Sequence, residues 1–113
     1  MPVTISSFSP NTKLSDGRYG LNRKKGSKSK ATIKGTGLTN GLPVNIKYPG
    51  ESEEPQMKWT GTTANSNADN TQCDVELTQE REGKINEDDP GGISVTTGDS
   101  TPPKPFKVPL GIA

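Results

Sequence analysis

The sequence predicts an all-β protein built as one antiparallel β-sandwich of about seven short strands. Short runs of alternating apolar and polar residues recur along the chain, and clusters of Gly, Pro, Asn and Asp separate them. No stretch places enough apolar residues at helical spacing to give a clear helix face. Short strands with frequent turn signals are typical of a sandwich rather than a parallel α/β sheet.

The bulk composition indicates one thin-cored domain over residues 1–113. Hydrophobic residues make up 26% of the chain and aromatic residues 4%, against about 45–50% apolar (Gly included) in typical domains. Chains this lean in apolar residues are often disordered. Here the apolar residues fall in alternating runs and the net charge is only +1, so we expect a folded domain. There is no apolar run of membrane-spanning length and no secretory pattern in MPVTISSFSP.

The clearest strand signals lie at residues 31–34 and 44–48. Both runs alternate, and the connector between them contains Asn40-Gly41. Asn-Gly tolerates positive φ, which suits a turn joining two antiparallel strands. We therefore expect a strand pair here.

The other strands are expected over five ranges: 3–8, 56–60, 72–77, 93–97 and 106–110. Phe8 breaks the alternation of the first strand, which predicts a bulge or bend near Ser6-Ser7. Four prolines around the last strand place it at a sheet edge. The residues predicted to point inward are Val3, Ile5, Ala31, Ile33, Val44, Ile46, Tyr48, Met57, Trp59, Cys73, Val75, Leu77, Ile93, Val95, Phe106, Val108 and Leu110.

Three polar stretches are predicted to connect these strands. Residues 11–30 form a long basic loop, in which Tyr19 and Leu21 are the expected anchors to the core. Residues 61–70 are small and polar, typical of a turn or a poorly ordered loop. Residues 78–90 are charged; we expect a loop that contacts the core only through Ile85, with a short helix as the alternative.

Three motifs in chain order suggest a family. Residues 5–10 (ISSFSP), 31–38 (ATIKGTGL) and 91–97 (GGISVTT, followed by FKV at 106–108) resemble the opening, middle and closing motifs of IPT/TIG domains. The resemblance implies an Ig-like sandwich of the early-set class. Residues 11–30 are longer and more basic than the family's pattern, and Leu38 stands where an aromatic residue is common.

Catalysis is not expected. The chain has no His, and the lone Cys73 lies on the predicted inward face, where it acts as a small core hydrophobe. The acidic clusters at 51–54 and 87–89 fall in loops, whereas glycosidase chemistry needs two rigidly held carboxylates. No catalytic, cofactor-binding or metal-binding residue is predicted. Carboxylate oxygens of the kind that calcium prefers occur at Asp69, Asp74, Asp88, Asp89 and Asp99, but no EF-hand-like spacing is present.

Two candidate binding surfaces remain. Positive charge accumulates after Asp16. A solvated charged loop is the usual explanation of such a run, and contact with nucleic acid or another polyanion is the functional alternative. The candidate polyanion contacts are Arg18, Arg23, Lys24, Lys25, Lys28 and Lys30, with Lys34 next to them. Trp59 and Tyr48 are a candidate sugar-stacking pair if their strands lie at an edge, the alternative being core positions.

These observations favour a non-catalytic binding or assembly module whose partner is a protein, through self-assembly or a neighbouring domain. Relatives within the resembled family are modules of surface receptors, adhesins, polysaccharide-acting enzymes and DNA-binding transcription factors, and fold alone does not choose among these roles. A cell-surface or virion setting follows from the resemblance and a Ser/Thr/Asn/Gly-rich composition. Nucleic-acid or polyanion binding through residues 18–34 is the alternative, and an accessory carbohydrate-binding module is a second.

Overall fold

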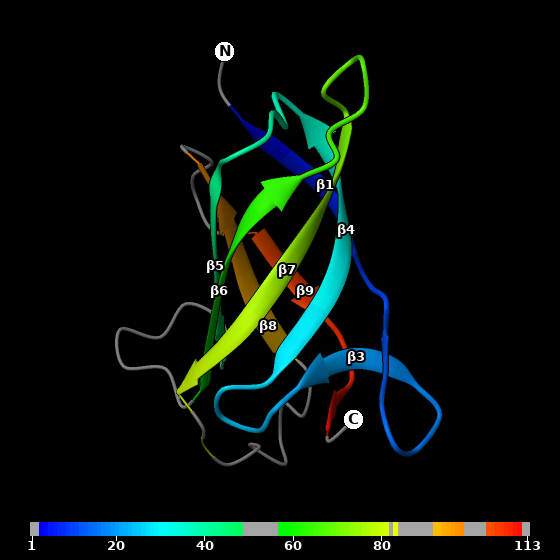
Figure 1. Ribbon diagram of the computed structural model, residues 1–113, viewed down its shortest axis with the longest axis vertical. Helices are drawn as coiled ribbons and strands as arrows, with labels where there is room; N and C mark the ends of the chain where they lie inside the picture. Colours follow the sequence, from blue (N-terminus) through cyan, green and yellow to red (C-terminus); the bar gives the residue numbers. More distant parts are fainter. Residues whose placement is uncertain (1–2, 49–56, 82, 84–91, 99–103, 112–113) are drawn as a thin grey trace.

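The computed structural model describes residues 3–48, 57–81, 83, 92–98 and 104–111, and in these residues it contains strands and turns but no helix. Seven strands form one antiparallel sheet, the large sheet (Figure 1). Its spatial order is β1 (Thr4–Pro10), β4 (Lys28–Thr36), β7 (Gln72–Arg81), β6 (Met57–Ala64), β5 (Pro43–Tyr48), β8 (Gly92–Thr97) and β9 (Lys104–Lys107). A small sheet has the order β10 (Leu110–Gly111), β3 (Tyr19–Asn22) and β2 (Thr12–Lys13).

The strand order of the large sheet is that of an immunoglobulin-like sandwich. Lettered A to G along the chain, its seven strands follow the order A-B-E-D-C-F-G. Constant-type immunoglobulin domains place ABED in one sheet and CFG in the other. Here β6 and β5 also pair over six residues, so the two layers are continuous at that edge. The predicted all-β sandwich is confirmed.

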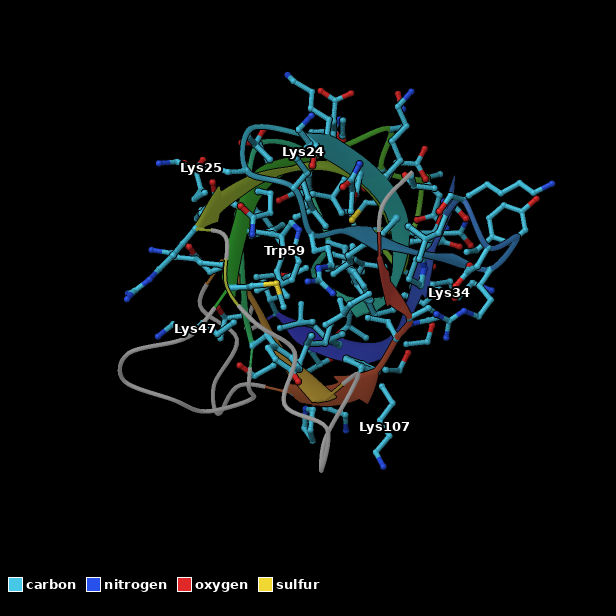
Figure 2. All side chains as sticks on the ribbon, turned by 90° about the horizontal axis from the view of Figure 1, so that it is seen from below. Lys24, Lys25, Lys34, Lys47, Trp59 and Lys107 are labelled. Carbon is cyan, nitrogen blue, oxygen red and sulfur yellow. The ribbon has the colours of Figure 1, made fainter. Side chains whose placement is uncertain are left out.

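The sheet bends so far that its two ends meet. The rings of Phe8 in β1 and Phe106 in β9 lie with centroids 6.1 Å apart, although these strands are at opposite ends of the sheet order. Seen along the long axis, the strands surround a packed interior that contains Trp59 (Figure 2). The core is therefore enclosed by one curved sheet.

The alternation in the sequence placed the core correctly. Of the residues predicted to point inward, all are buried except Phe106, which is half-buried. The bulge predicted in β1 is present as a register shift between Ile5 and Ser7, and β9 is an edge strand as its prolines indicated. Phe8, Leu14 and Leu38 are further core residues that the alternation did not identify.

The expected pairing of residues 31–34 with 44–48 is wrong. The first range lies in β4, which pairs with β1 and β7, and the second lies in β5, which pairs with β6 and β8. The connector crosses between the two halves of the sandwich, and the Gly41 N–H donates to the Thr63 carbonyl at 2.9 Å. A local turn signal does not report which strands become neighbours.

Several strands are longer or more divided than predicted. β7 continues beyond Leu77 because Gln79 is buried like the apolar residues before it. Gly61 to Ala64 belong to β6 rather than to a loop, and the following turn is ordered by Asn67, whose side-chain oxygen accepts from the N–H of Thr71 at 2.8 Å. The range 106–110 is split between β9 and β10. Ile85 lies outside the described residues.

The largest correction concerns residues 11–30, which are not a long loop. They contain β2, β3 and the first residues of β4, and both Leu14 and Leu21 are buried. No described segment is a helix long and apolar enough to cross a membrane.

Candidate functional site

The β2–β3 hairpin is closed by short-range hydrogen bonds. The Leu14 N–H donates to the Arg18 carbonyl at 2.7 Å, and the Gly17 N–H donates to the Leu14 carbonyl at 2.9 Å. The Asp16 carboxylate accepts from the backbone N–H of Arg18 at 3.0 Å and from its Nε at 2.8 Å. These hydrogen bonds from Arg18 lower the pKa of the Asp16 carboxyl below its ordinary value. The hairpin tip is therefore a defined turn.

β10 pairs with β3 on the side opposite β2, so β3 is the central strand of the small sheet. β10 runs parallel to β3, and the N–H groups of Leu21 and Arg23 donate to the carbonyls of Pro109 and Gly111 at 3.0 and 2.8 Å. The contact is close because β3 has a glycine at the crossing: a Cβ on Gly20 would lie 2.1 Å from the Pro109 oxygen. The small sheet needs a residue without a side chain there.

Trp59 joins the two sheets. Its Nε1–H donates to the carbonyl of Asn22 in β3 at 2.9 Å, and the Asn22 N–H donates to the side-chain oxygen of Ser29 in β4 at 2.8 Å. The hairpin is consequently held in one orientation relative to the core.

Tyr19 lies on the outside of this arrangement. It is 57% exposed and is the only large hydrophobic residue exposed within the described ranges. Lys13 is directly opposite in β2, so the two side chains share a face. Both Tyr19 and Leu21 were expected to anchor residues 11–30. Leu21 does so, but Tyr19 does not, since the hairpin extends away from the large sheet (Figure 1).

The predicted polyanion contacts lie on three parts of the fold. One is the hairpin tip, one is the turn between β3 and β4, and one is the outer face of β4; in chain order the residues are Arg18, Arg23, Lys24, Lys25, Lys28 and Lys30. Two of the cations are already engaged: Arg18 forms an ion pair with Asp16 at 2.6 Å, and Lys28 forms one with Glu76 at 3.3 Å. Polyanion contact through residues 18–34 stays a prediction.

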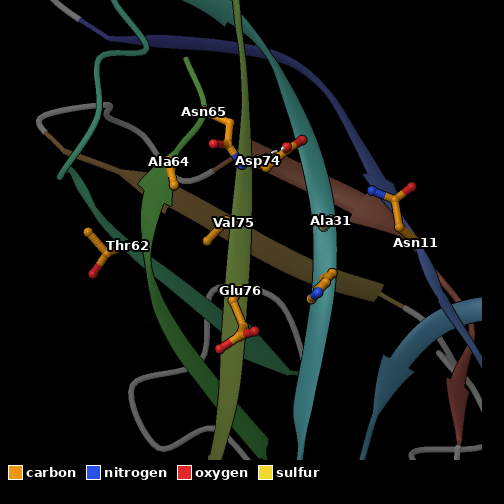
Figure 3. Close-up of a pocket in the computed structure, with 9 residues that line it drawn as sticks. Asn11, Ala31, Thr62, Ala64, Asn65, Asp74, Val75 and Glu76 are labelled. Atoms are coloured by element: carbon orange, nitrogen blue, oxygen red, sulfur yellow. Dashed lines mark hydrogen bonds between the residues drawn. The ribbon is translucent and has the colours of Figure 1, made fainter.

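A groove of about 350 Å³ with a mixed polar and apolar lining lies on the outer face of β4, β7 and β6 (Figure 3). Asp74 lines it and accepts hydrogen bonds from Asn65 Nδ2 and Thr32 Oγ1, both at 3.3 Å. Asn11 Nδ2 donates to Thr32 Oγ1 at 2.9 Å. Asn65 and Asp74 thus bond each other within the groove, and the described lining residues include no aromatic ring.

The candidate sugar-stacking pair is corrected by the structure. Trp59 and Tyr48 are both 0% exposed, so neither ring presents a face to a ligand. Their strands, β6 and β5, lie inside the large sheet rather than at its edge. The alternative interpretation, that both rings belong to the core, describes them correctly.

The other candidate residues are placed as follows. Cys73 is buried in β7, and burial raises the pKa of its thiol, which favours the unreactive protonated form. Asp69 and Asp74 are in the described part of the chain, while Asp88, Asp89 and Asp99 are outside it. Among the residues that the structure describes, no three Cys, Asp or Glu side chains are grouped closely enough to hold a metal ion.

No family model, no curated protein and no solved structure matches this chain.

Proposed function

We propose that this protein is a non-catalytic binding or assembly module that contacts a protein partner through the β2–β3 hairpin. The observation that carries the proposal is the exposure of Tyr19 on a hairpin that is otherwise firmly held. Four other aromatic residues, Phe8, Tyr48, Trp59 and Phe106, contribute to the core of a chain that has only 4% aromatic residues.

The chemistry of the hairpin suits a protein interface. Tyrosine and arginine are the side chains most enriched, with tryptophan, among residues that dominate binding energy. Tyr19 follows Arg18 directly, and the Arg18 guanidinium is oriented by Asp16. Because hydrogen bonds to β10 already order the hairpin, binding would require little further loss of chain entropy.

A catalytic role has little support. The chain contains no His, and its lone thiol is buried. A nucleophile needs an adjacent base and access to substrate, and Cys73 lacks that access.

The same proposal includes a relationship to IPT/TIG domains and a setting on a cell surface or in a multi-subunit particle such as a phage virion. The immunoglobulin-like strand order supports the relationship. The small sheet accounts for the main departure from the family's pattern, because residues 11–30 provide two of its three strands.

The test compares Tyr19→Ser with Tyr19→Phe and with Lys107→Ser, an exposed control on β9. Self-association of the purified chain is measured by sedimentation velocity over a concentration series. A second measurement looks for a partner other than a second copy of this chain. A photo-crosslinking amino acid is placed at position 19, the chain is expressed in its native source, and the crosslinked protein is identified.

If the hairpin is the interface, Tyr19→Ser weakens association about tenfold or more, and the other two variants behave as the unchanged protein. Unchanged association in Tyr19→Ser, or no site-specific crosslink in a chain that does not self-associate, would refute the proposal.

A further inference from the structure

A row of three cations crosses the large sheet at the ends of three neighbouring strands. Lys47 in β5 is directly opposite Lys58 in β6, and Lys58 is directly opposite Arg81 in β7. All three point outward: Ile46 and Tyr48 flank Lys47 and are buried, and Met57 and Trp59 do the same for Lys58. Neighbouring strands are about 4.8 Å apart. Lys47, Lys58 and Arg81 are called the cationic row below.

A β-bulge is responsible for the third member. In β7 the alternation runs inward at Leu77 and Gln79, so Arg81 would also point inward if the strand were regular. The register shift opposite Lys58 and Trp59 pairs Trp59 with Gln79 and Lys58 with Arg81. Glu80 and Arg81 are consequently both exposed. Bulges commonly re-aim a side chain at a functional position.

Among the described residues, the acidic side chains of Glu80 and Glu76 are directed elsewhere. Glu80 accepts a hydrogen bond from Thr60 Oγ1 at 2.8 Å, further along β6 from Lys58, and Glu76 forms its ion pair with Lys28. In the described part of the chain, neither of the two ion pairs involves the cationic row. Like charges placed directly opposite each other across strands are destabilising.

The β3–β4 turn extends positive charge beside the row. The Gly26 N–H donates to the Gln79 carbonyl at 2.8 Å, and the Gln79 N–H donates to the Ser27 carbonyl at 2.9 Å. This fixes the turn that bears Lys24 next to the end of β7. Figure 2 shows Lys25 and Lys47 projecting on one side of the molecule, with Lys34 on the opposite side.

We propose that the cationic row is a binding site for a compact phosphate-type oxyanion. Two ammonium groups and one guanidinium on adjacent strands can converge on one tetrahedral anion, and Arg adds bidentate hydrogen bonding to its oxygens. A compact anion fits better than a long polyanion. The net charge of the chain is only +1, and acidic residues follow the row in sequence at 51–54 and 82.

The binding test titrates the protein at low ionic strength with inorganic pyrophosphate and with glycerol 3-phosphate, using calorimetry and ³¹P NMR. The two probes distinguish a free anion from a phosphate ester. The variant Lys58→Gln/Arg81→Gln is compared with Lys30→Gln/Lys34→Gln, which removes the same charge from exposed positions on β4. We expect at least one probe to bind, the first variant to bind about tenfold more weakly or worse, and the control to retain binding. Failure of both probes to bind, or equal losses in both variants, would overturn the proposal.

A stability measurement tests the same row without any ligand. If the three cations repel one another, Lys58→Gln raises the melting temperature at low salt by about 1–4 °C, and added salt reduces the difference. A lower melting temperature in Lys58→Gln would mean that acidic residues of the chain neutralise the row, and the proposal would then fail.

Discussion

The large sheet and the small sheet of this protein are stabilised by different interactions. The large sheet encloses a core whose side chains alternate inward along every long strand, as in β7, where Cys73, Val75 and Leu77 are buried. The strands of the small sheet contribute Leu21 and Leu110 to that core. The small sheet is also held by backbone hydrogen bonds of β3 to the segment of β10, by the close approach of Gly20 to Pro109, and by the Trp59–Asn22 hydrogen bond.

The two sheets therefore differ in role: the large sheet supplies most of the buried side chains, and the small sheet holds Tyr19 exposed to solvent. An inward side chain of the large sheet contributes to stability by leaving water, so every inward position there is constrained by its neighbours. The small sheet is fixed by backbone hydrogen bonds and by a few buried side chains, and Tyr19 on its outer face is exposed to solvent. We therefore expect mutations in the two sheets to have separable effects.

The largest effect is expected from Trp59→Ala. The ring is fully buried and also donates to Asn22 across the two sheets, so its removal should cost about 3–5 kcal/mol of unfolding free energy. Urea denaturation followed by circular dichroism measures this. Trp59→Phe keeps most of the packing and loses the hydrogen bond, and it should cost less. A cost below about 1 kcal/mol for Trp59→Ala would contradict this account of the core.

Two glycines allow the sheets to be perturbed one at a time. In Gly20→Ala the new Cβ would lie 2.1 Å from the Pro109 oxygen, and in Gly35→Ala it would lie 1.9 Å from the Thr4 oxygen. Each should cost about 1–3 kcal/mol. By amide hydrogen exchange, Gly20→Ala should expose β2, β3 and β10, whereas Gly35→Ala should expose β1 and β4. Loss of protection throughout the large sheet in Gly20→Ala would show that the sheets are not separable.

The smallest effect concerns the charge at the hairpin tip. Hydrogen bonds from Arg18 lower the pKa of Asp16 in the folded protein. Protonation therefore favours the unfolded chain, and the contribution of this contact is present at neutral pH and lost as the pH falls through the folded pKa. An NMR titration of the Asp16 carboxyl should show a midpoint below that of an unperturbed aspartate. Arg18→Gln should return the midpoint to the ordinary range.

Much of the fold could be predicted because strand faces are encoded locally. Alternation placed Ile33, Ile46 and Val75 in the core before any pairing was known, and the parity break at Phe8 predicted the bulge in β1. Gln79 was missed because a buried amide interrupts the apolar pattern. The candidate sites could not be found in the same way, since both depend on which strands become neighbours.

The sequence by itself determined that this chain is all-β, where its core strands lie and which side of each faces inward, because side-chain alternation is a property of single strands. Only the tertiary structure decided that residues 11–30 form an ordered hairpin with Tyr19 exposed. It also decided that Lys47, Lys58 and Arg81 lie in one row. These features depend on register and on a bulge, which arise from pairing between strands far apart in the sequence.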